Sequence, residues 1–227
     1  MEGPEIVVVV AGGPGADPAA HLALVRAVPA GAPVVAADGG VDRALELGLR
    51  ISVAVGDFDS VSSSGLRAAS DAGARIDRQP ADKDATDLEL ALDAALELEP
   101  KRMLVLGSAQ GRLDHLLSSL LLLGEQRLAG VEVDALLGPA MVHVVRPGSS
   151  GRLDGSPGEL ISLFALHGPA VGVVTDGLRY PLAKETLEPG SSRGVSNVFA
   201  AREATLALER GVLLAVRPGG EDEARVA

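Results

Sequence analysis

Residues 51–60 read Ile-Ser-Val-Ala-Val-Gly-Asp-Phe-Asp-Ser, a short apolar run that leads through a glycine into two aspartates. The run is too short for a buried helix and is rich in β-branched residues, so it predicts a strand. The same pattern of strand, Gly- or Asp-bearing loop and helical spacing recurs along the first two thirds of the chain. The other runs are Ile6–Val10, Val34–Ala37 and Met103–Leu106, and the helical segments are Val41–Leu47, Leu66–Ala72, Thr86–Leu98 and Leu113–Leu123. Alternation of this kind predicts an α/β fold with a mostly parallel sheet and flanking helices.

The pattern changes from about Arg146 onward. Turn clusters rich in Gly, Ser and Pro are followed there by short β-prone runs without segments of helix length. The runs are Leu160–Leu166, Val171–Val174, Val195–Ala200, Ala204–Glu209 and Val212–Val216. This spacing predicts a smaller C-terminal antiparallel β-sandwich or barrel. We therefore expect an α/β domain over 1–146, a β-rich domain over 147–218 and a flexible tail over 219–227.

The composition narrows the classes of function. The chain has 227 residues, a formal net charge of −11, an aromatic share of 2% and no cysteine. The negative charge disfavours nucleic acid and anionic membranes, and the lack of cysteine excludes thiolate nucleophiles and cysteine-based zinc sites. The N-terminus is acidic, and the longest leucine-rich stretch, Leu116–Leu123, is far shorter than a membrane span. We expect a cytoplasmic protein that binds small ligands or metal ions.

The aspartates Asp57 and Asp59 lie where the strand Ile51–Val55 ends. That edge of an open α/β sheet is where ligands bind, and closely spaced carboxylates are the ligands that Mg²⁺ prefers. The alternative interpretation is a polar loop stabilised by an Asx turn, because an Asp-x-Asp pattern alone is weak evidence for a metal site.

A second acidic cluster, Asp82-Lys83-Asp84-Ala85-Thr86-Asp87, precedes the most regular helical segment. It offers further metal ligands at the same edge of the sheet. Asp84 or Thr86 could equally cap the helix while the remaining acids complement its dipole. The two interpretations are compatible, since one loop can do both.

Two glycine-bearing loops follow other predicted strands. Gly107-Ser108-Ala109-Gln110-Gly111-Arg112-Leu113-Asp114-His115 opens a helix and would direct backbone N–H groups toward an anion. It is neither a Walker A loop nor a dinucleotide fingerprint, and Arg112 is as readily explained by pairing with Asp114 as by binding phosphate. Asp38-Gly39-Gly40 adds a carboxylate at the same edge, or is simply a tight turn.

Taken in order, four segments resemble the signature of the thiamine pyrophosphokinase family. They are Asp38-Gly39-Gly40, Gly56-Asp57-Phe58-Asp59-Ser60, Lys83-Asp84-Ala85-Thr86-Asp87 and Gly111-Arg112-Leu113-Asp114-His115. In the C-terminal part, Asp176-Gly177-Leu178-Arg179-Tyr180-Pro181-Leu182 and Ser196-Asn197 resemble the family's thiamine-binding domain, with Tyr180 where some relatives carry tryptophan. The resemblance implies transfer of a pyrophosphoryl group from ATP to the hydroxyl of thiamine, giving thiamine diphosphate and AMP.

The resemblance also assigns roles to residues. It implies that Mg²⁺ is held against ATP, with Asp57, Asp59, Asp84 and Asp87 as catalytic residues and Asp57, Asp59 and Asp87 as the metal ligands. The nucleotide-binding residues would be Asp38, Thr86, Gly107, Ser108, Gly111, Arg112, Asp114 and His115, and the thiamine-binding residues would be Ser196 and Asn197. It further implies a homodimer in which the two subunits share each site, and no nucleic-acid or membrane partner.

Two alternatives stay open at this point. A pyrophosphokinase for another small alcohol, such as a hydroxymethylpterin, would use the same ATP and metal chemistry. A catalytically inactive regulator that binds nucleotide or thiamine is a different class, although all three proposed metal aspartates are present in the chain.

Overall fold

The computed structural model describes residues 3–14, 18–149 and 151–219. Its contacts divide the chain into two compact units. The first comprises residues 1–119 and 133–138, and the second comprises residues 120–132 and 139–227. The domain boundary expected after residue 146 stays a prediction, and residues 220–227 of the expected tail lie outside the described residues.

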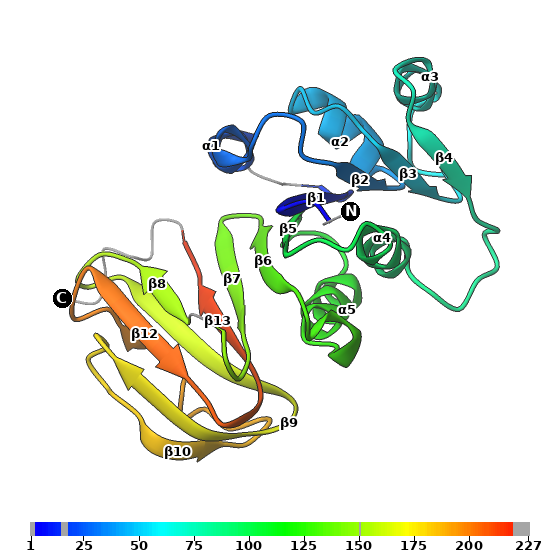
Figure 1. Cartoon of the computed structure of the whole chain (residues 1–227). Helices are drawn as coiled ribbons and strands as arrows, with labels where there is room; N and C mark the ends of the chain where they lie inside the picture. Colours follow the sequence, from blue (N-terminus) through cyan, green and yellow to red (C-terminus); the bar gives the residue numbers. More distant parts are fainter. Residues whose placement is uncertain (1–2, 15–17, 150, 220–227) are drawn as a thin grey trace. The chain divides into compact units, whose positions relative to one another are not determined.

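The first unit is built on a parallel sheet (Figure 1). Strands β2, β3 and β4 lie in order on one side of β1, and β5 lies on its other side, with β6 beyond it. The strands are β1 (Ile6–Ala11), β2 (Val34–Ala37), β3 (Val53–Gly56), β4 (Arg75–Arg78), β5 (Arg102–Gly107) and β6 (Glu132–Leu137). The order reverses between β1 and β5, and such a switch point is where α/β sheets bind ligands.

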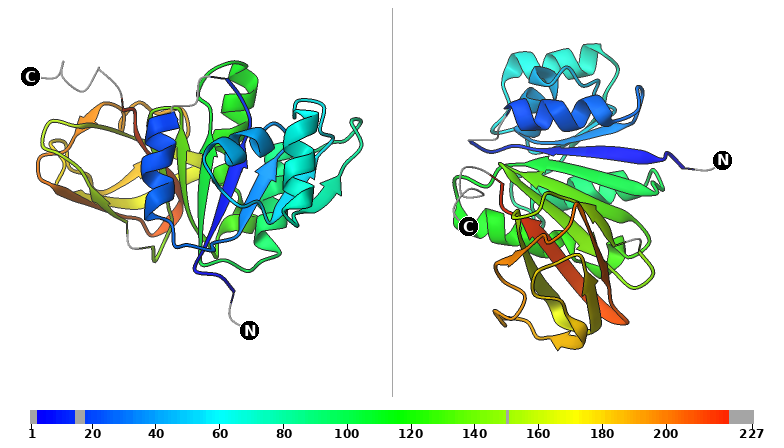
Figure 2. Two further views of the ribbon diagram at one scale, coloured as in Figure 1. Left: turned by 90° about the horizontal axis from the view of Figure 1, so that it is seen from above. Right: turned by 90° about the vertical axis from the view of Figure 1, so that its left-hand side faces the viewer.

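Helices cover both faces of this sheet. Figure 1 and Figure 2 show α2 and α3 on one face and α4 on the other. The helices are α1 (Pro18–Ala27), α2 (Gly40–Glu46), α3 (Ser63–Asp71), α4 (Asp87–Leu96) and α5 (Leu113–Leu123), and a 3₁₀ turn, η1, spans Gln126–Leu128. The central strand β1 reads Ile-Val-Val-Val-Val-Ala, and its four valines are fully buried. Aliphatic side chains therefore fill the space between the layers, as the low aromatic content requires.

The second unit consists of antiparallel strands around their own core. The strands are β7 (Ala140–Val145), β8 (Arg152–Asp154), β9 (Leu160–Asp176), β10 (Ala183–Leu187), β11 (Asn197–Val198), β12 (Glu203–Ala207) and β13 (Arg210–Arg217). The core includes Ile161, Leu163, Phe199, Leu206 and Leu213, each at most 1% exposed. The predicted fold class, a parallel α/β part followed by antiparallel strands, is confirmed.

Strand β9 connects the two layers of this unit. Its first half pairs with β13 and its second half with β12 and β10. Between the halves, His167 and Gly168 have φ values of 57° and 137°. The two separate runs predicted at Leu160–Leu166 and Val171–Val174 thus form one bent strand, since the His-Gly break turns the chain without ending its pairing.

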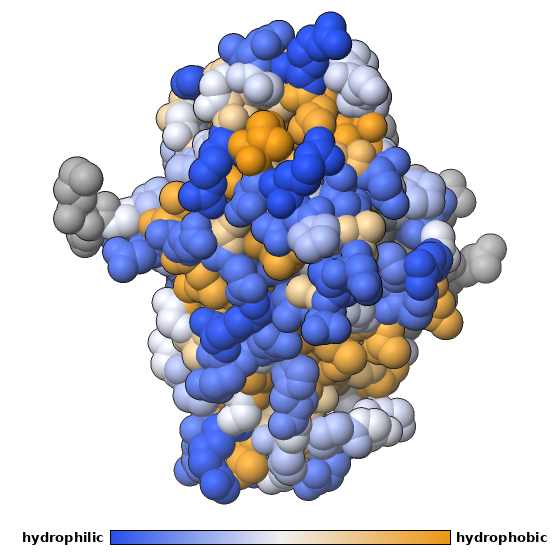
Figure 3. Space-filling view, turned by 90° about the vertical axis from the view of Figure 1, so that its right-hand side faces the viewer, coloured by the Kyte–Doolittle hydropathy of each residue, from blue (hydrophilic) through white to orange (hydrophobic). Residues whose placement is uncertain are grey.

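Figure 3 shows one face of the molecule, coloured by the hydropathy of each residue. Hydrophilic residues predominate on the face shown in Figure 3, with hydrophobic residues between them. Within the described residues, no helix is both long enough and apolar enough to cross a membrane.

Candidate active site at the carboxyl edge of the parallel sheet

The strand register places several acidic loops side by side. Ala11 of β1 is the partner of Ala37 of β2, and Ala37 is the partner of Val55 of β3. The residues that follow these strands therefore leave the sheet at the same level. Asp38 comes directly after β2, and Asp57 and Asp59 come directly after β3.

Three of these carboxylates form one cluster. Asp38, Asp57 and Asp59 each offer an oxygen, and these atoms lie within 4.8 Å of one another. Asp38 is only 8% exposed, and its Oδ1 atom is buried without a hydrogen-bond partner among the described residues. A buried carboxylate oxygen without a partner is energetically costly unless a cation or a water molecule reaches it. The cluster therefore fits a hard divalent cation such as Mg²⁺, which binds oxygen ligands and completes its shell with water and phosphate.

The backbone around the cluster has an unusual shape. Asp38 and Phe58 have φ values of 42° and 62°, which lie in a backbone region that residues other than glycine seldom adopt. The Asp59 N–H donates to Asp57 Oδ1 at 3.3 Å. Arg78 Nη1 donates to the Asp57 carbonyl at 2.9 Å, and its guanidinium lies 4.9 Å from the centre of the Phe58 ring. Loop and edge strand together hold the two aspartates in place.

Asp87 also lies at this edge but has a different partner. Its Oδ1 lies 2.9 Å from Lys83 Nζ, and the same ammonium lies 3.4 Å from Asp57 Oδ2. Burial alone would raise the pKa of Asp57, but the Asp59 N–H and the Lys83 ammonium outweigh it, so this pKa lies below its usual value. Burial would lower the pKa of Lys83, but its contacts with Asp87 and Asp57 raise it. Both groups therefore stay charged at neutral pH.

Two other residues of the second acidic segment, Asp84 and Thr86, had been given two alternative roles. Thr86 caps α4, because its hydroxyl accepts a hydrogen bond from the Glu89 N–H at 3.2 Å. Asp84 is exposed. Of the two interpretations of this loop, capping by Thr86 is therefore observed, while a direct role for Asp84 stays a prediction.

The loops after β1 and β5 pack against each other at the switch point. Ser108 Oγ donates to the Pro14 carbonyl and accepts from the Gln110 N–H at 3.0 Å. A Cβ atom on Gly13 would lie 2.9 Å from the Ser108 Cβ, and Gly111 has a φ of 95°. These glycines permit the close approach of the two loops. Ser108 and Gly111 belong to this pair of packed loops and Gly107 is buried beside them, while their predicted role in nucleotide binding stays a prediction.

Arg112, Asp114 and His115 are exposed at the start of α5. Arg112 binds Asp114 through two hydrogen bonds, of 3.2 Å and 2.6 Å. The hydrogen bond from Arg112 lowers the pKa of Asp114 to about 2. The alternative of mutual pairing is thus observed, and binding of phosphate by Arg112 stays a prediction.

The second unit holds the predicted thiamine residues. Ser196 is exposed with a φ of 56°, whereas Asn197 is 4% exposed. Asn197 Oδ1 accepts hydrogen bonds from the N–H groups of Tyr180 and Val198, at 3.0 Å and 2.8 Å, and Asn197 Nδ2 donates to the Tyr180 carbonyl at 2.8 Å. Asn197 therefore fixes the backbone beneath the Tyr180 side chain, which is 53% exposed.

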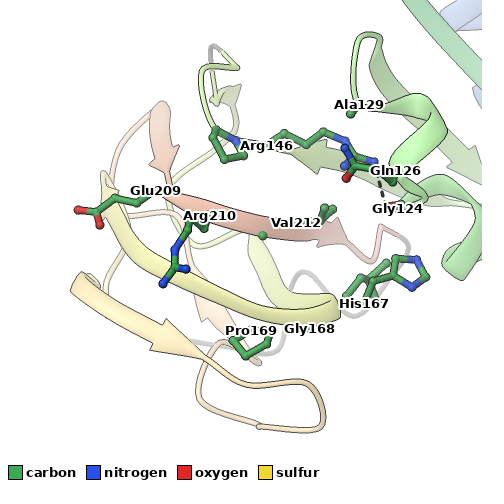
Figure 4. A pocket seen from close by; sticks show the side chains of 13 residues that line it. Gly124, Gln126, Ala129, Arg146, His167, Gly168, Pro169, Glu209, Arg210 and Val212 are labelled. Carbon is green, nitrogen blue, oxygen red and sulfur yellow. Dashed lines mark hydrogen bonds between the residues drawn. The ribbon is translucent and has the colours of Figure 1, made fainter.

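A hollow of about 660 Å³ lies elsewhere in the second unit, beside the bend of β9 (Figure 4). Its buried cation, Arg146, donates to the carbonyls of Gly124 and Glu125 at 2.9 Å and 2.7 Å, just past the end of α5. Burial lowers the pKa of Arg146. Figure 4 shows the Glu209 carboxylate pointing away from Arg146. The arginine satisfies carbonyl groups at a helix C-terminus, which is a structural role.

Sequence reasoning missed two features of the acidic site. Asp38 was assigned to the nucleotide, but it lies in the cluster with Asp57 and Asp59. Lys83 was given no role, but it bridges Asp57 and Asp87. A lysine amid the three aspartates Asp82, Asp84 and Asp87 was the available signal, although only the fold shows which acids it reaches.

Asp38→Asn provides a test of the divalent site. Asparagine tolerates a positive φ, so the variant should fold, but its amide cannot replace an anionic ligand. We expect saturating Mg²⁺ to stabilise the wild-type protein by about 2–3 kcal/mol at a hundred times the dissociation constant. The gain should largely disappear in Asp38→Asn and persist in Asp71→Asn, a change at the exposed end of α3. Thermal unfolding with Mg²⁺ and with EDTA measures it, and an unchanged gain in Asp38→Asn would remove this residue from the site.

Comparison with known proteins gives the family. A family model described as thiamin pyrophosphokinase, catalytic domain, matches residues 29–133. A second model, described as thiamin pyrophosphokinase, vitamin B1 binding domain, matches residues 150–213. A thiamine pyrophosphokinase of Bacillus subtilis is 28% identical over 137 residues, which are 60% of this chain and 64% of that protein. The chain thus matches somewhat less than two thirds of that curated relative.

Solved structures extend the similarity to the whole chain. The crystal structure of thiamine pyrophosphokinase from Bacillus subtilis matches with a TM-score of 0.80 and 25% identity, covering 95% of this chain and 99% of that one. The thiamin pyrophosphokinase structure from Candida albicans has the same fold, with a TM-score of 0.74 at 14% identity, covering 94% of this chain and 88% of that one. Because the two family models together match more than half of its residues, the chain belongs to the thiamine pyrophosphokinase family.

Proposed function

We propose that this protein transfers the pyrophosphoryl group of ATP to the hydroxyl of thiamine, releasing AMP and forming thiamine diphosphate. The observation that carries the proposal is the cluster of Asp38, Asp57 and Asp59 at the ligand-binding edge of the sheet, in a chain that matches both domains of the family. The location in the cytoplasm stays a prediction from the sequence.

The reaction makes few covalent demands on the protein. The hydroxyl oxygen of thiamine attacks the β-phosphorus of ATP, the bond from that phosphorus to the oxygen bridging the α- and β-phosphates breaks, and the hydroxyl proton is released. Because the nucleophile belongs to the substrate, the lack of cysteine is no obstacle. Catalysis of this kind rests on positioning and on neutralising charge.

The residues at the sheet edge suit these two tasks. Asp57 and Asp59, with Asp38 beside them, would hold Mg²⁺, which neutralises phosphate charge and polarises the reacting phosphorus when bound. Asp87 remains a proposed ligand that Lys83 occupies in this structure. Backbone N–H groups of the loop after β5, at the start of α5, would donate hydrogen bonds to phosphate oxygens. We assign no general base.

The products of turnover test the proposal. We expect purified protein with ATP, Mg²⁺ and thiamine to yield AMP and thiamine diphosphate in equal amounts, and Asp57→Asn or Asp59→Asn to lose at least about a hundredfold in kcat while keeping the wild-type circular dichroism spectrum. A reaction in which a hydroxymethylpterin replaces thiamine serves as the control for the alternative substrate. Release of ADP, or formation of AMP only with the pterin, would overturn the assignment.

For thiamine we propose the surface formed by Tyr180, Val195 and Ser196 in the second unit. All three side chains are exposed, and Asn197 holds the backbone of Tyr180 beside them. The exposed Tyr180 ring offers a face to a cationic thiazolium. In this arrangement Ser196 contacts the substrate, whereas Asn197 shapes the surface from beneath.

Two alanine variants separate these roles. Asn197→Ala leaves backbone groups of Tyr180 and Val198 without partners, so we expect a loss of about 2 kcal/mol or more in the free energy of unfolding. Ser196→Ala should change stability by no more than about 0.5 kcal/mol while raising the KM for thiamine and leaving the KM for ATP unchanged. Urea unfolding and steady-state kinetics measure the two effects. A wild-type KM in Ser196→Ala would exclude it from the thiamine site.

We also propose that the active protein is a homodimer. Leu113, Leu117 and Leu121 are spaced four residues apart on α5 and are 78%, 56% and 39% exposed. Residues at this spacing share one face of a helix. An exposed stripe of leucines on one face of a helix is typical of a surface that another chain covers. A second copy is the partner that the family resemblance implies.

A charge placed in this stripe tests the dimer. We expect the wild-type protein to have twice the monomer mass in size-exclusion chromatography with light scattering, and Leu117→Lys to shift the mass toward that of the monomer, because burying a lysine in an apolar contact is unfavourable. Val174→Lys, at an exposed apolar position of β9, is the matched control and should stay dimeric. A wild-type monomer, or a dimeric Leu117→Lys, would contradict the proposed interface.

A further inference from the structure

Lys83 lies in the loop between β4 and α4, amid the acidic groups of the candidate site. Its ammonium lies 2.9 Å from Asp87 Oδ1 and 3.4 Å from Asp57 Oδ2, and its side chain is only 14% exposed. Asp87 is the residue one turn further along, at the start of α4. The lysine is therefore held between two elements rather than extended into solvent.

The position of Lys83 matters because each carboxylate oxygen of Asp57 already has one partner. Oδ1 accepts the Asp59 N–H at 3.3 Å, and Oδ2 is the oxygen that faces the Lys83 ammonium. Each of these oxygens keeps a further lone pair, so a divalent cation at the Asp38, Asp57 and Asp59 cluster would share the Asp57 carboxylate with the Lys83 ammonium. The ammonium is the partner that a like-charged metal ion repels.

The other cation near this loop cannot take over the role as it stands. Arg78 donates to the backbone carbonyl of Asp57 and lies over the Phe58 ring, so its contacts are with the loop and not with a carboxylate of the cluster. In the described part of the chain, Asp57 and Asp87 both form ion pairs with Lys83. One ammonium thus offsets the repulsion between these carboxylates.

We infer that Lys83 is an internal counter-ion that a divalent cation repels from Asp57. The shorter contact with Asp87 keeps the displaced ammonium at the site, beside the bound metal. Repulsion between the two cations makes binding of the metal alone weak. On the proposed function, a polyphosphate relieves that repulsion because its negative charges accept both cations, so metal and nucleotide load together.

Binding of Mn²⁺ without ATP or thiamine tests the inference. Electron paramagnetic resonance of the free ion gives the dissociation constant. Lys83→Met removes the competing charge, so we expect about tenfold tighter binding, the factor that 1.4 kcal/mol of relieved repulsion provides. Lys83→Arg keeps the charge and should bind no more tightly than wild type. Lys101→Met is the matched control, because it removes the same charge from an exposed pair with Glu5.

A measurement on the wild-type protein covers the case in which Lys83→Met does not fold. The chain has three lysines, Lys83, Lys101 and Lys184, so reductive ¹³C-methylation gives few NMR signals while keeping the charges. We expect Mg²⁺ to shift the Lys83 signal, assigned by its absence in Lys83→Arg, and to leave the other two unchanged. A Lys83 signal that does not move at saturating Mg²⁺ overturns the inference.

Two further results would overturn it: binding of Mn²⁺ by Lys83→Met that is no tighter than by Lys101→Met, and no binding by any variant. None of these measurements contains substrate, so they stand apart from the turnover assay. A protein that makes no thiamine diphosphate can still show displacement of Lys83, and an active enzyme can fail to show it.

Discussion

The candidate site depends on one constraint: the parallel sheet ends its strands at one level and so gathers carboxylates that repel one another. Asp38 follows β2, and Asp57 and Asp59 follow β3. Only the pairing of β2 with β3 brings Asp38 close to the other two aspartates. The backbone at Asp38 and Phe58 is held in positive φ, which costs of order 1–3 kcal/mol at each residue. The buried valines of β1 and their neighbours stabilise the sheet enough to tolerate both.

The second unit depends on a different constraint, the bend in β9. One strand pairs first with β13 and then with β12 and β10, so its two halves fix the two layers with respect to each other. Polar contacts as well as apolar packing stabilise the part of this unit around β11. Asn197 joins β11 to the turn that carries Tyr180, and the neighbouring Phe199 is buried in the core. A rigid base beneath an exposed aromatic ring is what a binding surface for a small flat molecule requires.

Much of the parallel sheet was predictable because most of its strands are short, buried apolar runs of sequence. Strands β1, β2, β3 and β5 were expected within one or two residues, since each is apolar and short. Strand β4, Arg-Ile-Asp-Arg, was not predicted, because it lies at the edge of the sheet and has no apolar run. The break in β9 was misread as two strands because His-Gly-Pro is typical of a turn. The residues of the site were predictable by type and by family resemblance, and so was their position at one edge of the sheet, but their individual contacts were not. Asp38 and Lys83 enter the cluster through strand pairing and a loop path that spacing along the chain does not encode.

The choice of lysine at position 83 follows from the same electrostatics. An arginine would present a planar fork that grips a carboxylate through two hydrogen bonds, as Arg112 grips Asp114. A lysine presents a compact charge that two carboxylates can share and that one of them can release. In a chain of net charge −11 that carries three lysines, placing one between Asp57 and Asp87 balances the acidic edge without closing it to a metal ion. If the cluster binds a divalent cation as proposed, its counter-ion should be held by contacts of unequal strength, and the distances of 2.9 Å and 3.4 Å describe such a pair.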